Sequence, residues 1–431
     1  MNRRVVITGI GVVAPNGVGK EAFQHALENG ISGIRFDPQL AELKFSCTVS
    51  GRPEVSPAEM NQYFTASEQR NLNASGIVYG VIAGMQAWQD AGLTIRYKSA
   101  SPDWDSGVIF GSVTSGVDKF RECIYKIDAQ QTRQLGSTSV IQTMNSGVSA
   151  YLAGKLGLGN QVTTNSSACT TGTEGLLMAF ERVKTGKATR MLVGSTGDSG
   201  PYIWAGFDAI KVCNFRSNQA PEKASRPMSA SAAGIVPSSG AGALVVEDLE
   251  SALKRNATIY AEILGGHINS GGQTGTGTMT APNEEAVKRC IQKAVEDAGI
   301  EPKEIDCING HLTATSKDAL EIQNWSEALG LSGNDFPYIN SLKSLIGHCF
   351  GAAGSIELVS SVLELHHDFI FPSINSGDLH PEVAACIDAG KVPQNVIYQT
   401  VNVIAKASFG FGDVNACVIL KKYSYGTNGK A

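Results

Sequence analysis

The stretch TTNSSACTTGTEG, residues 163–175, places Cys169 among small hydroxyl residues and glycines. β-Branched residues at 162–164 predict a strand before it, and apolar residues at helical spacing predict a helix after it. The small residues permit a sharp turn that lifts the Cys169 side chain onto the N-terminus of that helix. There, the partial positive charge is expected to lower the thiol pKa, and turn N–H groups are expected to stabilise an oxyanion. On this stretch alone, a buried structural thiol fits equally well.

Short apolar strands alternate with helical patterns along the whole chain, which predicts a layered α/β fold. The pattern restarts after about residue 256, and a chain of 431 residues is long enough for two domains. We therefore expect two α/β halves, divided as 1–252 and 253–431.

Two glycine-rich segments allow more than one interpretation. After the strand expected at 5–7, Gly9 and Gly11 resemble a degenerate dinucleotide fingerprint, but Pro15 would break the helix that such a site needs. A strand followed by a tight turn fits better. Residues 214–240 are rich in Ser, Ala and Pro and lie between core strands, which predicts a long ordered loop or a lid.

The composition excludes several classes of protein. Hydrophobic residues make up 42% and charged residues 17%, and a net charge of −5 with no long basic run argues against nucleic-acid binding. The nine cysteines form no CxxC pair, which disfavours a disulfide framework or a zinc ribbon. With no apolar run of membrane-spanning length and no apparent secretory signal, we expect a cytoplasmic protein that spans no membrane.

Two histidines lie in turns that resemble the turn around Cys169. His311 follows the strand expected at 305–309, and His348 lies five residues after Lys343 at the start of a helical pattern. Active sites of open α/β sheets are built at such strand ends. One cysteine and two histidines could also form a three-ligand metal site, but no pair has close ligand spacing and no fourth ligand is evident. A Cys/His nucleophile system fits better.

Five stretches together resemble the β-ketoacyl-acyl-carrier-protein synthases, the elongating condensing enzymes of the thiolase superfamily. They occur in the family's order along nearly the whole chain. They are RVVITGIGVVAPNG (4–17), NSSACTTGTEG (165–175), NGHLTATSKDALE (309–321), SLKSLIGHCFGAAGSIE (341–357) and SFGFGDVNACVILKK (408–422). This resemblance implies a five-layer α-β-α-β-α thiolase-like fold made of two similar halves.

The resemblance also implies roles for individual residues. Cys169 would accept the acyl chain, and His311 and His348 would promote decarboxylation of a malonyl unit. Lys343 resembles the family's buried lysine. Its expected partner is Glu321, and the pair would balance charge and tune His311, or serve as a structural ion pair.

Further positions match the family's substrate-binding groups. Thr313 and Thr315 would hold the pantetheine arm. Phe411 would be the gating phenylalanine, and its N–H would complete an oxyanion hole with that of Cys169. The chain departs from the pattern at Leu312, at 233–242 and at Asp413, which suggests a divergent branch.

The implied reaction is the elongation of an acyl chain by two carbons in fatty acid or polyketide/polyene biosynthesis. It needs no metal or redox cofactor, because the phosphopantetheine arm arrives on acyl carrier protein. We expect a basic rim at the pocket mouth for that acidic partner. The resemblance implies a homodimer, with a heterodimer as the alternative.

Two other functions would also use part of this residue set. One is a thiolase that acts on coenzyme A thioesters, but such enzymes use a second cysteine in a Cys-x-Gly loop, and Cys417 lies in an apolar strand. The other is a non-catalytic chain-length-determining subunit, which would lack the nucleophile.

Overall fold

The structure, a computed structural model, describes residues 3–98 and 101–424, so the outermost residues of both expected halves lie outside it. In this part of the chain, 11 strands form one continuous sheet. Two groups of five strands within it repeat one topology: β1-β8-β7-β5-β6 and β9-β15-β14-β10-β11 in spatial order. The first group is β1 (Val5–Ala14), β5 (Ser106–Ser112), β6 (Val162–Thr163), β7 (Arg190–Gly197) and β8 (Gly240–Asp248). The second is β9 (Ala261–Ser270), β10 (Cys307–Asn309), β11 (Tyr338–Asn340), β14 (Val403–Gly410) and β15 (Val414–Lys421).

The pairing directions repeat as well. From β1 to β6, and again from β9 to β11, the successive pairs are antiparallel, antiparallel, parallel and parallel. Residues Val5 to Ile7 of β1 also pair with Ala261 to Ile263 of β9, which joins the two groups. The expected α/β fold of two similar halves is confirmed.

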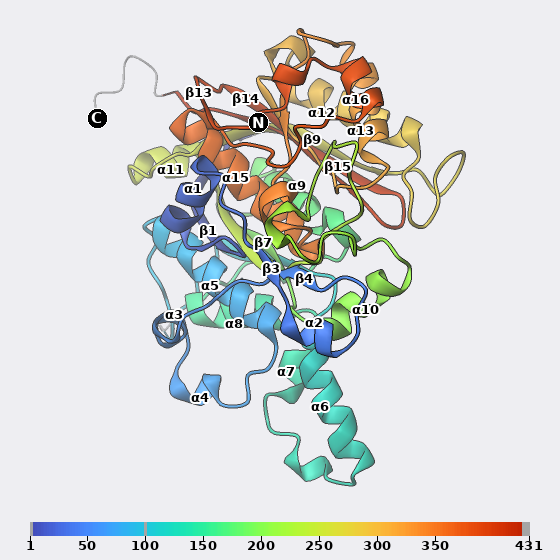
Figure 1. Cartoon of the computed structure of the whole chain (residues 1–431). Coiled ribbons are helices and arrows are strands. Elements are labelled where there is room, and N and C mark those ends of the chain that lie inside the picture. The colour runs from blue at the N-terminus through green and yellow to red at the C-terminus, as the bar shows by residue number, and fades with distance from the viewer. Residues whose placement is uncertain (1–2, 99–100, 425–431) are drawn as a thin grey trace.

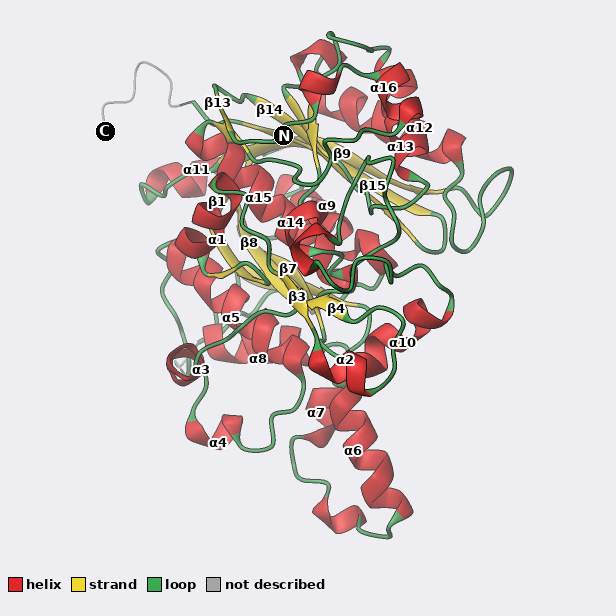
Figure 2. Ribbon diagram, in the orientation of Figure 1, coloured by secondary structure: helices red, strands yellow, loops and turns green. Residues whose placement is uncertain are grey.

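Helices cover the two groups of strands in layers. Helices α9 (Thr171–Lys184) and α15 (Ala353–His367) pack against each other between them (Figure 1). The outer face of the first group carries α5 (Ser75–Asp90) and α8 (Gly147–Leu156). The outer face of the second carries α12 (Glu284–Ala298) and α13 (Asp318–Leu329) (Figure 2). The order is therefore helix, sheet, helix, sheet, helix.

The two central helices begin in the same way. A short 3-10 turn, η2 (Ala168–Thr170), runs into α9, and another, η5 (Phe350–Ala352), runs into α15. The first residue of each turn is left-handed, with φ of 48° at Ala168 and 49° at Phe350. Cys169 and Gly351 therefore occupy equivalent positions in the two halves.

The tight turn expected at Gly9 and Gly11 is wrong, because β1 continues through both glycines to Ala14. A Cβ at Gly9 would lie 2.2 Å from the carbonyl oxygen of Ala87, and one at Gly11 would lie 2.0 Å from that of Ala83. Both carbonyls belong to α5. The glycines let this helix pack directly on the strand.

Residues 214–240 form the expected ordered loop, which contains the 3-10 turn η3 (Pro221–Lys223) and is buried from Gly234 onward. No described helix is long and apolar enough to cross a membrane. Further helices and the strands β3 and β4 connect these elements. They are α1 (Lys20–Glu28), β3 (Ile34–Phe36), α2 (Pro38–Glu42), β4 (Val49–Gly51), α3 (Pro57–Tyr63), α4 (Ala66–Gln69), α6 (Val117–Asp128), α7 (Ser139–Thr143), α10 (Pro201–Ala209), α11 (Leu249–Lys254), α14 (Lys343–Ile346) and α16 (Pro381–Cys386).

Candidate active site

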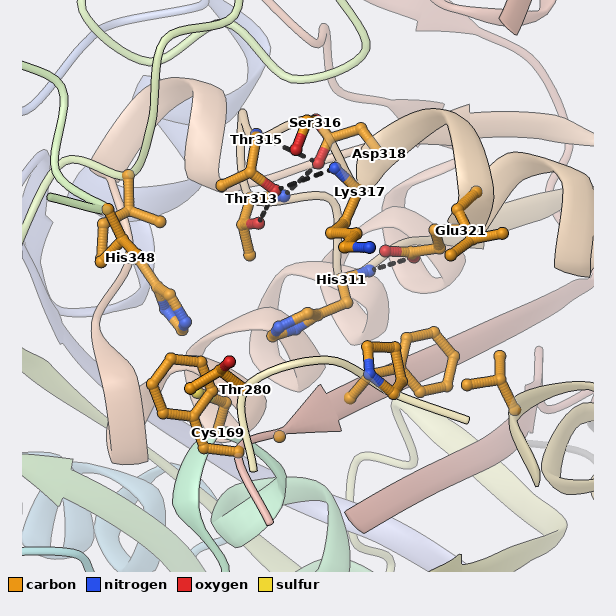
Figure 3. A pocket seen from close by; sticks show the side chains of 18 of the residues that line it. Cys169, Thr280, His311, Thr313, Thr315, Ser316, Lys317, Asp318, Glu321 and His348 are labelled. Atoms are coloured by element: carbon orange, nitrogen blue, oxygen red, sulfur yellow. Dashed lines mark hydrogen bonds between the residues drawn. The ribbon is translucent and has the colours of Figure 1, made fainter. Parts of the chain in front are cut away.

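Cys169, His311 and His348 meet in one pocket at the junction of the two halves. The Cys169 sulfur and one ring nitrogen of each histidine all lie within 4.8 Å of one another. The two imidazoles have their centroids 5.5 Å apart and stand nearly perpendicular, at 82°. Figure 3 shows both rings pointing into the space above Cys169. The structure thus brings together three residues that lie as far as 179 positions apart in the chain (348 − 169).

The turn that carries Cys169 is fixed by its small neighbours. The backbone N–H of Ser167 donates to the Thr171 hydroxyl at 2.9 Å, and the Asn165 side-chain amide donates to the Thr171 carbonyl at 2.8 Å. Opposite the turn, a Cβ on Gly410 would lie 3.2 Å from the backbone nitrogen of Cys169. The close approach of this glycine brings the backbone of Phe411 next to the thiol.

The expected low thiol pKa is wrong. Burial raises the pKa of the Cys169 thiol to about 11, although the Lys343 charge and the N–H groups of Phe411 and Cys169 act in the opposite direction. The loss of hydration of a thiolate outweighs the partial charge of the helix end. The resting side chain is therefore a thiol. The same two N–H groups face the sulfur, which is the arrangement that an oxyanion hole requires.

Both histidines are neutral at physiological pH. Burial, followed by the charge of Lys343, holds the pKa of His311 and that of His348 well below the usual range. The Nδ1 of His348 accepts a hydrogen bond from the Phe350 N–H at 3.2 Å, which leaves the proton of the neutral ring on Nε2. The backbone N–H of His348 donates to the Val236 carbonyl at 2.8 Å, so the loop before β8 positions this ring.

The expected pairing of Lys343 with Glu321 is wrong. Lys343 pairs with Glu357 of α15, and both are buried. The two carboxylate oxygens of Glu321 instead accept the backbone N–H groups of His311 and Leu312 at 2.7 and 2.8 Å. The first turn of α13 places this carboxylate directly beside the backbone after β10. Burial raises the pKa of Glu321 to about 7.

The predicted substrate-binding residues all line the same pocket. The hydroxyls of Thr313 and Thr315 lie 3.1 Å apart, and Phe411 lies near Phe207, with ring centroids 6.1 Å apart. Lys317 is the exposed cation among the lining residues. Sequence patterns had not identified several other lining residues, which are Phe207, Val212, Ile235, Thr280, Pro282, Val287, Leu320, Asn324, Phe350 and Phe409.

The charges around the pocket favour a nucleophile over a metal ligand set. The three ligand atoms are close enough to bind one ion. However, the buried ammonium of Lys343 opposes a cation there, and it lowers the pKa of both histidines. A second buried lysine, Lys406, acts on both rings in the same direction.

Comparisons with known proteins agree on one family. The family model described as "Beta-ketoacyl synthase, N-terminal domain" matches residues 2–252, and "Beta-ketoacyl synthase, C-terminal domain" matches 260–377. The chain is similar to 3-oxoacyl-[acyl-carrier-protein] synthase 1 of Haemophilus influenzae, with 32% identity over 98% of this chain and 100% of that protein.

Solved structures with 27% identity show the same fold. One is a type II PKS ketosynthase bound to the hexaketide and in complex with its acyl-carrier protein (TM-score 0.85). Another is the ishigamide ketosynthase/chain length factor (TM-score 0.86). Each comparison covers 98% of this chain and 100% of the other.

Proposed function

The chain belongs to the β-ketoacyl synthase family, and we propose that it condenses an acyl chain held on Cys169 with a malonyl unit carried on acyl carrier protein. Membership of the 3-oxoacyl-[acyl-carrier-protein] synthase family makes the protein an acyltransferase. The observation that supports the roles of individual residues is the meeting of Cys169, His311 and His348 within 4.8 Å.

In the first half-reaction, the Cys169 sulfur attacks the thioester carbonyl of an acyl carrier protein. The bond to the pantetheine sulfur breaks, and the proton of the Cys169 thiol ends on that departing sulfur. Negative charge develops on the carbonyl oxygen, where the N–H groups of Cys169 and Phe411 can stabilise it. Since the resting thiol is protonated, the reaction forms the thiolate only when the substrate is present.

In the second half-reaction, a malonyl thioester loses carbon dioxide, and the electron pair moves onto its thioester as an enolate. Neutral imidazoles of His311 and His348 can donate hydrogen bonds to the enolate oxygen. The enolate carbon then attacks the acyl group on Cys169. The carbon–sulfur bond breaks, a 3-oxoacyl chain two carbons longer leaves on the carrier, and the cysteine thiolate takes up one proton from solvent, which is the proton that the overall reaction consumes.

The remaining lining residues suit the expected substrate. Thr313 and Thr315 offer hydroxyls that can hold the polar pantetheine arm, and Phe207, Ile235 and Phe350 offer apolar surface for the acyl chain. Lys317 supplies one positive charge at the rim for an acidic carrier protein.

The two alternatives account for less of the site. A thiolase needs a second reactive cysteine, but Cys417 is fully buried in β15, and burial raises the pKa of its thiol to about 12. A non-catalytic chain-length subunit has no use for a nucleophile. Similarity both to the 3-oxoacyl-[acyl-carrier-protein] synthase and to the two ketosynthase structures named above leaves a fatty acid role and a polyketide role both open.

We also propose that the chain forms a dimer through the projecting helix α6. Phe120, Ile124 and Ile127 are exposed at the spacing of a single helical face, and α6 extends from the body with α7 (Figure 1). A second copy of this chain can bury that face, and a chain-length partner is the alternative.

The proposed function also includes cytoplasmic localisation and a division of the chain into two halves between residues 252 and 253.

Intact-mass analysis after incubation with acyl-[acyl carrier protein] tests the proposed function. We expect an acyl adduct on the wild-type protein and on Cys386→Ala, which removes a partly exposed thiol on α16. Cys169→Ala should abolish the adduct, and an adduct that survives this substitution contradicts the role of Cys169. Malonyl-[acyl carrier protein] decarboxylation by His311→Ala and His348→Ala tests the histidines, since wild-type rates in both would exclude them.

A further inference from the structure

A second buried lysine lies beneath the candidate site. Lys406 is on β14, three residues before Phe409, and its side chain is completely buried. Its Nζ donates to the Thr173 hydroxyl at 2.8 Å, lies 2.9 Å from Oε2 of Glu357, and also donates to the Ser408 hydroxyl. Two hydroxyls accept hydrogen bonds from the ammonium, and the ion pair with Glu357 is its third polar contact.

These contacts join the segments that carry the site. Thr173 lies in the first turn of α9, four residues after Cys169. Glu357 is on α15 and also binds Lys343. Lys406 itself belongs to the strand that ends in Gly410, whose backbone packs against Cys169.

The charges in this cluster do not balance. One carboxylate, Glu357, lies between two ammonium groups, Lys343 and Lys406. Burial lowers the pKa of Lys406, and the charge of Glu357 opposes this shift. The other titratable groups that interact with Lys406 are His311, His348 and Cys417 of β15, whose thiol is protonated because burial raises its pKa to about 12. Thr173 and Ser408 are neutral. A buried charge without a counter-ion lowers the stability of the fold, so its presence points to a role in function.

We propose that Lys406 is a positioning residue whose ammonium, sharing Glu357 with Lys343, leaves a surplus positive charge beneath Cys169, His311 and His348. That charge stabilises each anion that the reaction forms, from thiolate to enolate, and disfavours protonation of the imidazoles. The inference rests on the function proposed above. It assigns a role to a residue that touches neither substrate nor reacting atoms.

The pKa values of the two rings agree with this role. The charge of Lys406 lowers the pKa of both His311 and His348, in addition to the larger contributions of burial and of Lys343. An imidazolium in this place would be a third buried cation beside Lys343 and Lys406. The carboxyl groups nearby are Glu357, between the two lysines, and Glu321, whose pKa burial raises to about 7. The surplus charge therefore keeps both hydrogen-bond donors in one protonation state.

The test measures the alkylation of Cys169 by iodoacetamide between pH 7 and 10, which needs no carrier protein. A failure here is therefore distinguishable from a failure of the acyl-adduct experiment. Lys406→Met should displace the rate–pH curve upward by about half to one pH unit, because it leaves Glu357, whose charge raises the thiol pKa, with one lysine partner instead of two. At pH 8 the alkylation should be roughly three- to tenfold slower.

Two variants serve as controls. Lys406→Arg keeps the charge and should restore the wild-type curve. Lys119→Met removes another buried lysine, which pairs with Glu122 at 3.0 Å on α6, and should leave the curve unchanged. A Lys406→Met curve that superimposes on the wild-type curve overturns the proposal.

Glu357→Gln should change the alkylation rate in the opposite direction. This variant tests the proposal even if Lys406→Met does not fold. It removes the one carboxylate between the two lysines and should accelerate alkylation at pH 8. A purely structural disturbance has no reason to speed the reaction in one variant and slow it in the other. Unchanged or slower alkylation in Glu357→Gln overturns the proposal.

Discussion

A hydrogen bond of 3.2 Å from the Phe350 backbone N–H to Nδ1 of His348 fixes the tautomer of the His348 imidazole. The Phe350 ring also stacks on the imidazole, with centroids 5.1 Å apart and an angle of 22°. The Nδ1 side of the His348 ring is therefore occupied by Phe350, and its Nε2–H can donate to a substrate in the pocket. A donor fixed in advance stabilises a developing oxyanion without reorganisation.

His348→Ala should reduce decarboxylation of malonyl-[acyl carrier protein] by about 10²- to 10³-fold, the usual cost of removing one oxyanion donor. Release of carbon dioxide measures the rate directly. His380→Ala is the matched control, since His380 caps α16. A loss of similar size in the control would show that the effect is not specific to the site.

Alkylation of wild-type Cys169 should rise about tenfold per pH unit from pH 7 to 9 without reaching a plateau, because its thiol pKa of about 11 leaves little thiolate in this range. Mass spectrometry of the modified peptide measures the rate. The alkylation rate of a small thiol with an ordinary pKa should level off above pH 9 in the same buffers. A plateau below pH 8 for Cys169 would contradict the raised pKa.

Glu321→Ala should slow decarboxylation about ten- to a hundredfold, since two buried N–H groups, those of His311 and Leu312, would lose their acceptors at about 1–3 kcal/mol each. The displaced backbone would carry the His311 ring with it. Glu327→Ala, an exposed change on the same helix, is the control. Decarboxylation at the wild-type rate in Glu321→Ala would remove this positioning role.

Asp413→Ala should loosen the loop of residues 271–283, which supplies Thr280 and Pro282 to the pocket. The Asp413 carboxylate accepts the backbone N–H groups of Gln273 at 2.9 Å and Asn283 at 2.8 Å. We expect faster amide hydrogen exchange in this loop and a free energy of unfolding lower by about 1–3 kcal/mol. Asp413→Asn keeps one acceptor oxygen and should give an intermediate exchange rate.

Glu364→Gln should stabilise the protein increasingly as the pH rises from 5 to 9. Burial raises the pKa of the Glu364 carboxyl to about 8, so the folded state binds more protons than the unfolded state between roughly pH 4.5 and 8. Wild-type stability therefore falls with rising pH in this window, and the uncharged amide removes this contribution. Thermal unfolding of both proteins at pH 5, 7 and 9 measures the difference, which should not shrink with pH.

Much of the fold and the site could be predicted from local patterns. Helix α12 runs from Glu284 to Ala298 between an N-cap Asn283 and a C-cap Gly299, two residue types that mark helix ends in a sequence. The grouping of Cys169, His311 and His348 followed from their shared position in small-residue turns after strands. Such turns lie at the same edge of a layered α/β fold.

Contacts across the chain could not be predicted in the same way. Lys343 could have paired with either Glu321 or Glu357, and only the folded chain, which brings Glu357 of α15 to Lys343, selects Glu357. The thiol pKa depends on burial, which a stretch of 13 residues around Cys169 does not reveal. A lysine within an apolar strand, as at Lys406, is a signal that sequence reading can use.

The repeated turn at the start of α9 and α15 shows which residues of the candidate site each half of the molecule supplies. Both halves contain the same 3-10 turn with a left-handed first residue, yet the second residue is Cys169 in η2 and Gly351 in η5. The second turn contributes instead through the residues around its start, since His348 lies two residues before Phe350 and the Phe350 N–H donates to the His348 ring. A symmetrical scaffold thus carries a single, asymmetric centre to which each half brings what the other lacks, so neither half should react when produced alone.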